Sequence, residues 1–281
     1  MQGKTVVVTG ATSGIGQVAA EALARKGARI VFVARSPAKA VAQLERLSAI
    51  NPDVAHDFVQ ADLSTLAAMK LAGDGLAAKA PRIHVLINNA GAIFDRRELT
   101  PDGLERTFAV NHMAYFVVTE RLRPNLAEVA RIVSTASGAH ALGRLDFDDL
   151  QSERRFGAMR AYGASKLCNI LWTRELGRRL AGTGVTANCF HPGGVNTGFG
   201  SGTHGPMSSL FNLARPFLLT PEKGADTLVW LATAPEAQGS TGGYWSRRRL
   251  QQPSAAARDD AAAARLWAMS EAIANRVAAP A

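Results

Sequence analysis

The sequence has little cysteine and no long hydrophobic run. Its two cysteines, Cys168 and Cys189, lack the spacing of a metal site, and a core of this size has little need of one disulfide. We therefore expect no metal site and a reducing, cytoplasmic setting. No stretch reaches about 18 uncharged apolar residues, so no membrane span is expected. A first strand beginning near Lys4 would leave no room for a signal peptide.

The sequence also lacks an internal repeat, a dividing linker and a nucleic-acid-binding motif. Apolar residues make up 47% of the 281, enough for a substantial core, so one α/β domain is expected over residues 1–281. The net charge is +9, but the arginines are scattered apart from Arg247-Arg248-Arg249. We interpret this charge as compositional bias and attraction for a polyanionic cofactor, and expect no nucleic-acid partner.

Short runs rich in Val and Ile alternate with helical patterns along the chain. The runs show little polar alternation, which predicts strands buried on both faces, as in a parallel sheet. With right-handed crossovers, this order predicts a single doubly wound Rossmann domain of about seven parallel strands with helices on both faces. The expected strands are Thr5–Thr9, Arg29–Ala34, Val54–Gln60, Ile83–Asn88, Arg131–Thr135 and Val185–Phe190. The expected helices are Gly14–Lys26, Ser36–Ile50, Ser64–Ala78, Pro101–Leu122, Gly157–Leu180, Pro221–Leu231 and Ala255–Val277.

The region between the last motif and the final helices has its own composition. Gly198–Thr220 is rich in Gly and Ser and then becomes apolar. This pattern predicts a mobile lid over a substrate pocket, with an ordinary surface helix and loop as the alternative.

A glycine-rich turn follows the first expected strand and opens a helix. Gly10, Gly14 and Gly16 have the spacing G-x-x-x-G-x-G. Gly10 permits the tight turn, Gly14 lets the backbone approach a pyrophosphate, and Gly16 lets the helix pack on the sheet. A helix N-terminus after such a turn predicts a dinucleotide site, with a plain helix-capping turn as the alternative.

The end of the second strand lacks the carboxylate that would bind the ribose 2′-OH of NAD. Arg35 stands there instead, and Lys39 follows one helical turn later. A guanidinium suits a 2′-phosphate through charge-assisted hydrogen bonds, so NADP(H) is favoured over NAD(H), with a solvated arginine as the alternative. Asp62 could accept a hydrogen bond from the adenine amino group, although Ser64 beside it could simply cap the next helix.

Tyr162 and Lys166 place a phenol and an ammonium four residues apart on one helix face. A phenol with a pKa of about 10 is a poor base at neutral pH, and the charge of Lys166 is expected to lower that pKa. Ser137, after the fifth strand, could orient a substrate oxygen. Asn111 could bend its helix locally and hold a water that links Lys166 to solvent. The alternatives are a core tyrosine, a strand-end cap and a surface amide.

These residues occur in motifs that resemble those of classical short-chain dehydrogenases/reductases, most closely the retinol dehydrogenase-like branch. The matching motifs are Thr9-Gly-Ala-Thr-Ser-Gly-Ile-Gly16, Asn88-Asn-Ala-Gly91, Phe108-Ala-Val-Asn-His112, Ser137, Tyr162-Gly-Ala-Ser-Lys166 and His191-Pro-Gly-Gly-Val195. Further matches extend the resemblance over nearly the whole chain: Phe147-Asp-Asp-Leu150, Ser165-Lys-Leu-Cys-Asn169, Arg174-Glu-Leu-Gly-Arg178 and Ala264-Arg-Leu-Trp267.

The resemblance implies catalysis by Asn111, Ser137, Tyr162 and Lys166. It implies an NADP(H)-dependent oxidoreductase that interconverts a lipophilic alcohol and its aldehyde or ketone and that could form a homo-oligomer. The alternative is a non-catalytic NADP-binding sensor or scaffold on the same fold. The candidate cofactor-binding residues are Gly10, Thr12, Ser13, Gly14, Ile15, Gly16, Arg35, Asp62, Leu63, Asn89, Ala90, Gly91, Tyr162, Lys166, Pro192, Gly193, Val195 and Thr197.

Overall fold

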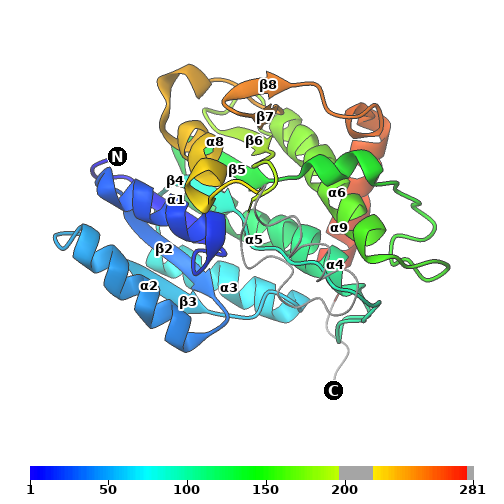
Figure 1. Cartoon of the computed structure of the whole chain (residues 1–281), viewed down its shortest axis with the longest axis horizontal. Coiled ribbons are helices and arrows are strands. Elements are labelled where there is room, and N and C mark those ends of the chain that lie inside the picture. The colour runs from blue at the N-terminus through cyan, green and yellow to red at the C-terminus, as the bar shows by residue number, and fades with distance from the viewer. Residues whose placement is uncertain (196–217, 277–281) are drawn as a thin grey trace.

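The computed structural model describes residues 1–195 and 218–276 (Figure 1). Its strands are β1 (Thr5–Thr9), β2 (Arg29–Ala34), β3 (Asp57–Gln60), β4 (Ile83–Asn88), β5 (Leu126–Thr135), β6 (Thr186–Phe190), β7 (Tyr244–Ser246) and β8 (Arg249–Gln251). Its helices are α1 (Gly14–Arg25), α2 (Pro37–Ile50), α3 (Leu66–Lys79), α4 (Arg106–Phe108), α5 (Ala114–Leu122), α6 (Ala158–Arg179), α8 (Pro221–Thr233) and α9 (Asp260–Ala274).

Within the described residues, one sheet runs in the order β3-β2-β1-β4-β5-β6-β7-β8. Strands β1 to β7 are parallel, and β8 is antiparallel to β7. The chain moves outward from β1 to β3 and then returns to place β4 on the other side of β1. This reversal at β1 and β4 is the switch point at which doubly wound sheets bind ligands, outside the carboxyl ends of the strands.

Helices cover both faces of the sheet, as predicted. Alternate side chains of β1 enter different cores: Val6 and Val8 pack on the side of α1, α2 and α8, whereas Val7 packs on the side of α3, α5 and α6. Helix α9 lies against α6, and its Trp267 packs edge-on against Phe116 of α5. Because the central strands β1, β2 and β4 are buried on both faces along most of their length, their sequences show apolar runs with little alternation.

The expectation of about seven strands is wrong, since the described residues form eight. Strands β7 and β8 have three residues each, too few to show a period of two. The two residues between them, Arg247 and Arg248, have φ angles of 52° and 58°. A two-residue hairpin loop with two left-handed residues usually carries Asn-Gly, so this pair of arginines gave no turn signal.

The expected helix Pro101–Leu122 begins five residues late. Gly103, with φ of 73°, continues a turn, and the Glu105 carboxylate then caps α4 by accepting from Thr107 N (2.8 Å) and Phe108 N (2.9 Å). Between α4 and α5, residues Ala109–Met113 form a π turn. The expected boundary was wrong because a side-chain cap, not hydrophobic periodicity, sets the start of this helix.

Several other boundaries also differ from expectation. Helix α9 begins at Asp260 instead of Ala255, because the Asp259 carboxylate caps it there by accepting from Ala262 N at 2.9 Å. Strand β5 begins at Leu126 instead of Arg131, and β3 begins at Asp57 instead of Val54. Thr65, not Ser64, caps α3 by accepting a hydrogen bond from Ala68 N at 3.2 Å. The alternative role considered for Ser64 is therefore wrong.

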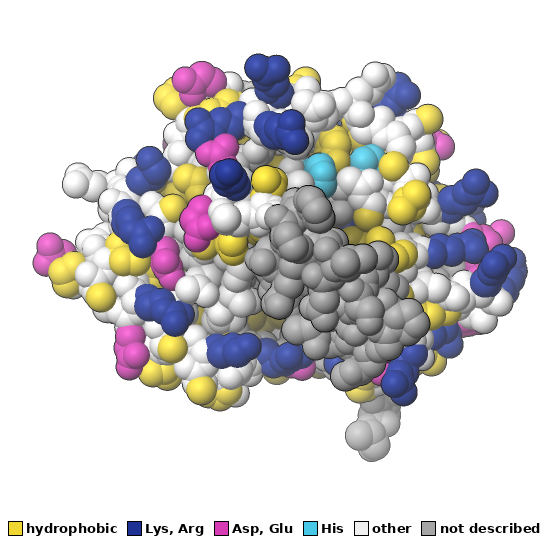
Figure 2. All heavy atoms as spheres, viewed as in Figure 1, with side chains coloured by type: hydrophobic (Ala, Val, Ile, Leu, Met, Phe, Trp, Pro, Cys, Tyr) yellow, Lys and Arg dark blue, Asp and Glu magenta, His cyan; other side chains and the backbone are white. Residues whose placement is uncertain are grey.

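Lys and Arg side chains are spread around the face shown in Figure 2, with Asp and Glu side chains between them. The positive charge visible on this face is therefore not gathered into one stripe. Cys168 and Cys189 are buried free thiols. Across the described ranges, no helix combines the length and the apolarity that a membrane-spanning segment requires.

Candidate active site

The turn after β1 is built from glycines that allow close backbone approach. Gly10 has φ of 72° and Gly14 has φ of 55°, a region that favours glycine. A Cβ at Gly10 would lie 2.8 Å from Ala90 Cα, and one at Gly16 would overlap the Gly10 carbonyl and the Asn89 amide. Ser13 is the N-cap of α1, but its side chain makes no capping hydrogen bond. The first amides of α1 are therefore not occupied by the cap and can bind an anion.

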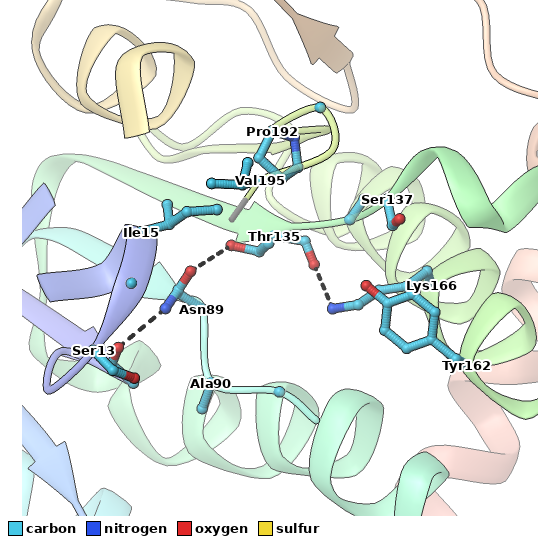
Figure 3. Close-up of a pocket in the computed structure, with 15 residues that line it drawn as sticks. Ser13, Ile15, Asn89, Ala90, Thr135, Ser137, Tyr162, Lys166, Pro192 and Val195 are labelled. Carbon is cyan, nitrogen blue, oxygen red and sulfur yellow. Dashed lines mark hydrogen bonds between the residues drawn. The ribbon is translucent and has the colours of Figure 1, made fainter. Parts of the chain in front are cut away.

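Hydrogen bonds join the carboxyl ends of β1, β4 and β5. Thr9 Oγ1 accepts from Asn89 N (3.0 Å) and Ala90 N (3.2 Å). Asn89 Nδ2 donates to Gly10 O (3.2 Å), and Thr135 Oγ1 donates to Asn89 Oδ1 (3.1 Å; Figure 3). Asn88 faces away from this network and donates to Thr119 Oγ1 (2.9 Å). Sequence reasoning missed Thr9 and Thr135, although a hydroxyl at the end of a buried strand is a signal for such a role.

Lys166 extends from α6 toward the end of β5. Its Nζ donates to Thr135 O at 3.0 Å and lies 5.7 Å from the centre of the Tyr162 ring (Figure 3). Nζ also lies 5.6 Å from the centre of the Tyr115 ring, which sequence reasoning did not identify. The side chain is 2% exposed, and this burial lowers the pKa of Lys166 to about 7.

The phenol of Tyr162 has a shift opposite to the one expected. Burial raises the pKa of Tyr162 to about 12, and a hydrogen bond with Ser137 partly opposes this rise. The expectation that Lys166 lowers the pKa of Tyr162 is therefore wrong for the protein without cofactor. Burial disfavours the charged phenolate more strongly than the neighbouring groups favour it. With a pKa this high, the phenol keeps its proton at neutral pH and can act as an acid.

Asn111 lies inside the π turn, so its helix departs locally from α geometry as expected. Its Nδ2 donates to Ala92 O (2.9 Å) and Ser165 Oγ (3.0 Å), and its Oδ1 accepts from Ala92 N (2.8 Å). Ser165 Oγ in turn donates to Tyr162 O (2.8 Å). Asn111 is fully buried, so the alternative of a surface amide is wrong. Its side chain joins the loop after β4 to the face of α6 that carries Tyr162 and Lys166.

These elements surround a cavity of about 240 Å³ at the carboxyl edge of the sheet. The candidate residues that line it are Gly10, Ser13, Gly14, Ile15, Asn89, Ala90, Gly91, Ser137, Tyr162, Lys166, Pro192, Gly193 and Val195. Gly16 and Asn111 are packed behind this wall and do not line it. Thr197 lies outside the described residues, as does the expected lid Gly198–Thr220 except for its last three residues.

A second cavity, of about 600 Å³, adjoins the first and shares Gly10, Ser13, Ala90 and Gly91 with it. The candidate residues Thr12, Arg35, Asp62 and Leu63 line this second cavity, together with Lys39. The loop after β4 contributes beyond the predicted Ala90 and Gly91, and sequence reasoning missed its later part, from Ala92 to Glu98. On that loop Glu98 forms an ion pair with Arg106, whose guanidinium lies 4.3 Å from the Phe94 ring centre.

Arg35 and Lys39 are the cations available at this end of the site. Both are exposed and line the second cavity. Within residues 1–195 and 218–276, neither side chain makes a hydrogen bond or an ion pair, whereas Arg96 and Arg106 face carboxylates. Arg35 and Lys39 can therefore bind an anionic group without breaking an existing pair.

A family model described as "short chain dehydrogenase" matches residues 4–204. The chain belongs to the short-chain dehydrogenase family. DnrU of Streptomyces sp. (strain C5), named as a candidate daunorubicin C-13 ketoreductase, is 43% identical over 279 residues, covering 97% of this chain and 93% of its own. Human retinol dehydrogenase 14 is 38% identical over 289 residues, covering 96% of this chain and 86% of its own.

A solved short-chain dehydrogenase from Burkholderia cenocepacia, crystallised in complex with NADP, superposes with a TM-score of 0.68. It is 28% identical, and the match covers 86% of this chain and 95% of the other. Together these matches place this dehydrogenase in the retinol dehydrogenase-like branch. The protein is an oxidoreductase of alcohols and carbonyls that binds a nicotinamide cofactor. The named dehydrogenase and reductase relatives favour an enzyme over the alternative of a non-catalytic scaffold.

Proposed function

We propose that the enzyme uses NADP(H) to interconvert lipophilic alcohols and their carbonyl compounds, with Tyr162 as the proton donor in reduction. One observation carries this proposal: Ser137 and Tyr162 are hydrogen-bonded to each other, and they lie in the same cavity as Lys166 and the glycine turn. All four line one cavity at the sheet's switch point.

The residues present fit a dinucleotide. The uncapped start of α1 offers amides to a pyrophosphate, and Gly10 and Gly14, which line the cavity, carry no side chain that would hinder its approach. When bound, the cofactor supplies or accepts the hydride at the reacting carbon. The two adjoining cavities extend from Tyr162 to Arg35, and this elongated space suits a dinucleotide with its nicotinamide near Tyr162 and its adenosine near Arg35.

Three side chains of this site have different roles toward the substrate oxygen. Ser137 Oγ accepts from Ala139 N (3.2 Å) and is hydrogen-bonded to Tyr162, so a carbonyl oxygen bound between the two hydroxyls would be oriented by both. Tyr162 then gives its proton to that oxygen as negative charge develops there. Lys166, held by Thr135 O, stands close enough to stabilise the phenolate that remains. Because both N–H donors of the Asn111 side chain are already used, a relay water would donate either to Asn111 Oδ1 or to a backbone carbonyl of the π turn.

The choice of NADP(H) rests on Arg35 and Lys39. A 2′-phosphate is a dianion that suits a guanidinium and an ammonium without partners. The NADP complex of the Burkholderia cenocepacia relative supports this choice. Asp62 lies in the same cavity, and we assign it to the adenine amino group.

The lipophilic substrate class rests on two supports. The relatives are named for retinol and for daunorubicin, which are both bulky molecules with large apolar parts. Ile15, Pro192 and Val195 give the catalytic cavity an apolar wall, and Leu219 lies against Gly193 beside it. The expected lid stays a prediction.

Removal of the Arg35 guanidinium tests the cofactor assignment. Arg35→Ala should weaken NADPH about ten- to a hundredfold and leave NADH almost unchanged, because only NADPH carries the 2′-phosphate. Binding of both cofactors by fluorescence titration gives the ratio. Arg46→Ala is the matched control, since Arg46 is exposed on α2 and does not line the cavity. Equal affinity of the wild type for NADH and NADPH would contradict the assignment.

The substrate class needs a separate measurement. Initial rates of NADPH oxidation with all-trans-retinal, daunorubicin, decanal and acetaldehyde should be higher for the first three than for acetaldehyde. A preference for acetaldehyde would contradict the lipophilic class and leave the cofactor assignment intact.

A further inference from the structure

Two histidine side chains hold the peptide unit that joins Ser137 to Gly138. His140 Nδ1 lies 2.7 Å from Ser137 O, and Gly138 N donates to His191 Nδ1 at 3.0 Å. This carbonyl and this N–H belong to the same planar peptide group. The group is therefore fixed at both of its polar ends, immediately after the serine that lines the catalytic cavity.

The hydrogen-bond partners of the two imidazole rings show which ring nitrogen carries the proton in each. A carbonyl oxygen only accepts, so His140 carries its proton on Nδ1, and its Nε2 accepts from Ser254 N at 3.1 Å. His191 accepts through Nδ1, also from Gly193 N at 3.4 Å, so its proton lies on Nε2. The two rings are thus neutral and have opposite tautomers.

Packing keeps both rings in place. His140 is 5% exposed and meets the Tyr244 ring edge-on, with 5.0 Å between the ring centres. The His191 ring covers Gly138 so closely that a Cβ there would lie 3.2 Å from His191 Nε2. Ser137 is extended (φ −158°, ψ 153°), and its Oγ accepts from Ala139 N in the 3-10 turn that follows, so the orientation of the Ser137–Gly138 peptide affects the hydrogen bond that holds Oγ.

We propose that His140 and His191 are positioning residues that act through Ser137, by holding the Ser137–Gly138 peptide from both sides. The inference rests on the proposed function, in which Ser137 orients the substrate oxygen. His191 also reaches Gly193, which lines the catalytic cavity, so the same ring connects the serine to the loop after β6. A small rotation of this peptide would misplace Oγ relative to Tyr162, and misplacement by about 1 Å can cost a hundredfold in rate.

The surroundings of the rings favour their neutral forms. Burial lowers the pKa of both histidines, and the nearby His140 and Arg247 further disfavour a positive charge on His191. Glu222, Lys223 and Asp226 of α8 line a cavity with His191, so charges of both signs face it from that side. Protonation of His191 would remove its acceptor, so the peptide should be released only at acidic pH.

Kinetics of two His191 variants test the proposal. His191→Leu removes the acceptor and should lower kcat about ten- to a hundredfold at saturating NADPH, with any carbonyl that the wild type reduces. His191→Asn keeps an acceptor oxygen near the Nδ1 position and should recover most of the rate. His84→Leu is the matched control, because His84 Nδ1 also accepts a backbone N–H, from Thr5 at 3.0 Å, far from the site. Equal losses in the Leu and Asn variants would overturn the proposal.

A double variant separates this proposal from the proposed function. If His191 acts through Ser137, His191→Leu should cost little further rate in a Ser137→Ala background. Equal fold losses in both backgrounds would overturn the positioning role alone. A Ser137→Ala enzyme with the wild-type rate would instead contradict the proposed function.

Ring-nitrogen NMR tests the geometry without any activity. In the 15N-labelled wild-type protein at pH 7.5, His140 should show the Nδ1–H tautomer and His191 the Nε2–H tautomer. Identical tautomers, or a protonated His191 at this pH, would overturn the proposal even if the variants were slow.

Discussion

Tyr162 and Lys166 lie on one face of α6, and the pKa of each is shifted in the direction that favours the neutral side chain. Burial raises the pKa of the phenol to about 12 and lowers the pKa of the ammonium to about 7. The sequence spacing predicted the pairing but not these directions, because burial of a side chain depends on what packs around it. Tyr115 and Thr135, which come from α5 and β5, provide part of that burial and were absent from the sequence prediction.

The buried lysine should make stability depend on pH. In the unfolded chain Lys166 titrates near 10.5, and in the folded protein near 7. Between these values the unfolded state binds a proton that the folded state has released, so the free energy of unfolding should rise with pH. The rise attributable to Lys166 approaches about 1.4 kcal/mol for each pH unit in this window.

Denaturant unfolding of cofactor-free wild type and Lys166→Met at pH 7 and pH 9.5 measures this effect. The free energy of unfolding should rise more between the two pH values in the wild type than in the variant. Lys26→Met is the control, because Lys26 is exposed at the C-cap of α1. The same rise in both proteins would show that Lys166 is charged in the folded state.

At the scale of elements, the site depends on how closely β1, α1 and β4 approach one another. Gly16 lies in the first turn of α1, and a Cβ there would overlap the Gly10 carbonyl oxygen and the Asn89 side-chain amide. A backbone oxygen cannot move aside by changing a rotamer, so the helix itself would have to shift.

Gly16→Ala should therefore lower stability by at least about 1–3 kcal/mol and weaken NADPH binding. Thermal unfolding and a fluorescence titration measure the two effects. Gly157→Ala is the matched control, because a Cβ at Gly157 would meet Arg160 Cβ at an ordinary 3.8 Å. A Gly16→Ala protein with wild-type stability and NADPH affinity would contradict this account of the turn.

The elements that could be predicted from the sequence are those whose signal lies in a few consecutive residues. The run Thr5–Thr9 and the glycine turn after it show their roles in neighbouring residues. A local bend at Asn111 was also predicted, but the π turn that forms it was not, and the hairpin at Arg247-Arg248 gave no turn signal in its own residues. The two-histidine arrangement around Gly138 was equally hidden, since it joins His140 and His191 across 51 positions of the sequence.

At the scale of the whole molecule, parallel strand order explains why distant residues meet. The carboxyl ends of β1, β4, β5 and β6 lie at one edge of the sheet (Figure 1). The segments that follow these strands therefore surround one cavity. Gly10, Asn89, Ser137 and Pro192 each follow one of these strands closely. The sequence could therefore predict which residues gather there, whereas the eighth strand and the path of the β4 loop needed the structure.

The central claim is that Tyr162 donates the proton that completes carbonyl reduction. Tyr162→Phe keeps the ring and its packing and removes only the hydroxyl. The measurement is stopped-flow oxidation of NADPH by wild type and variant, with a carbonyl that the wild type reduces. We predict unchanged NADPH affinity and a kcat lower by at least about a hundredfold, the usual contribution of a general acid. A Tyr162→Phe enzyme that reduces the carbonyl at close to the wild-type rate would contradict the claim.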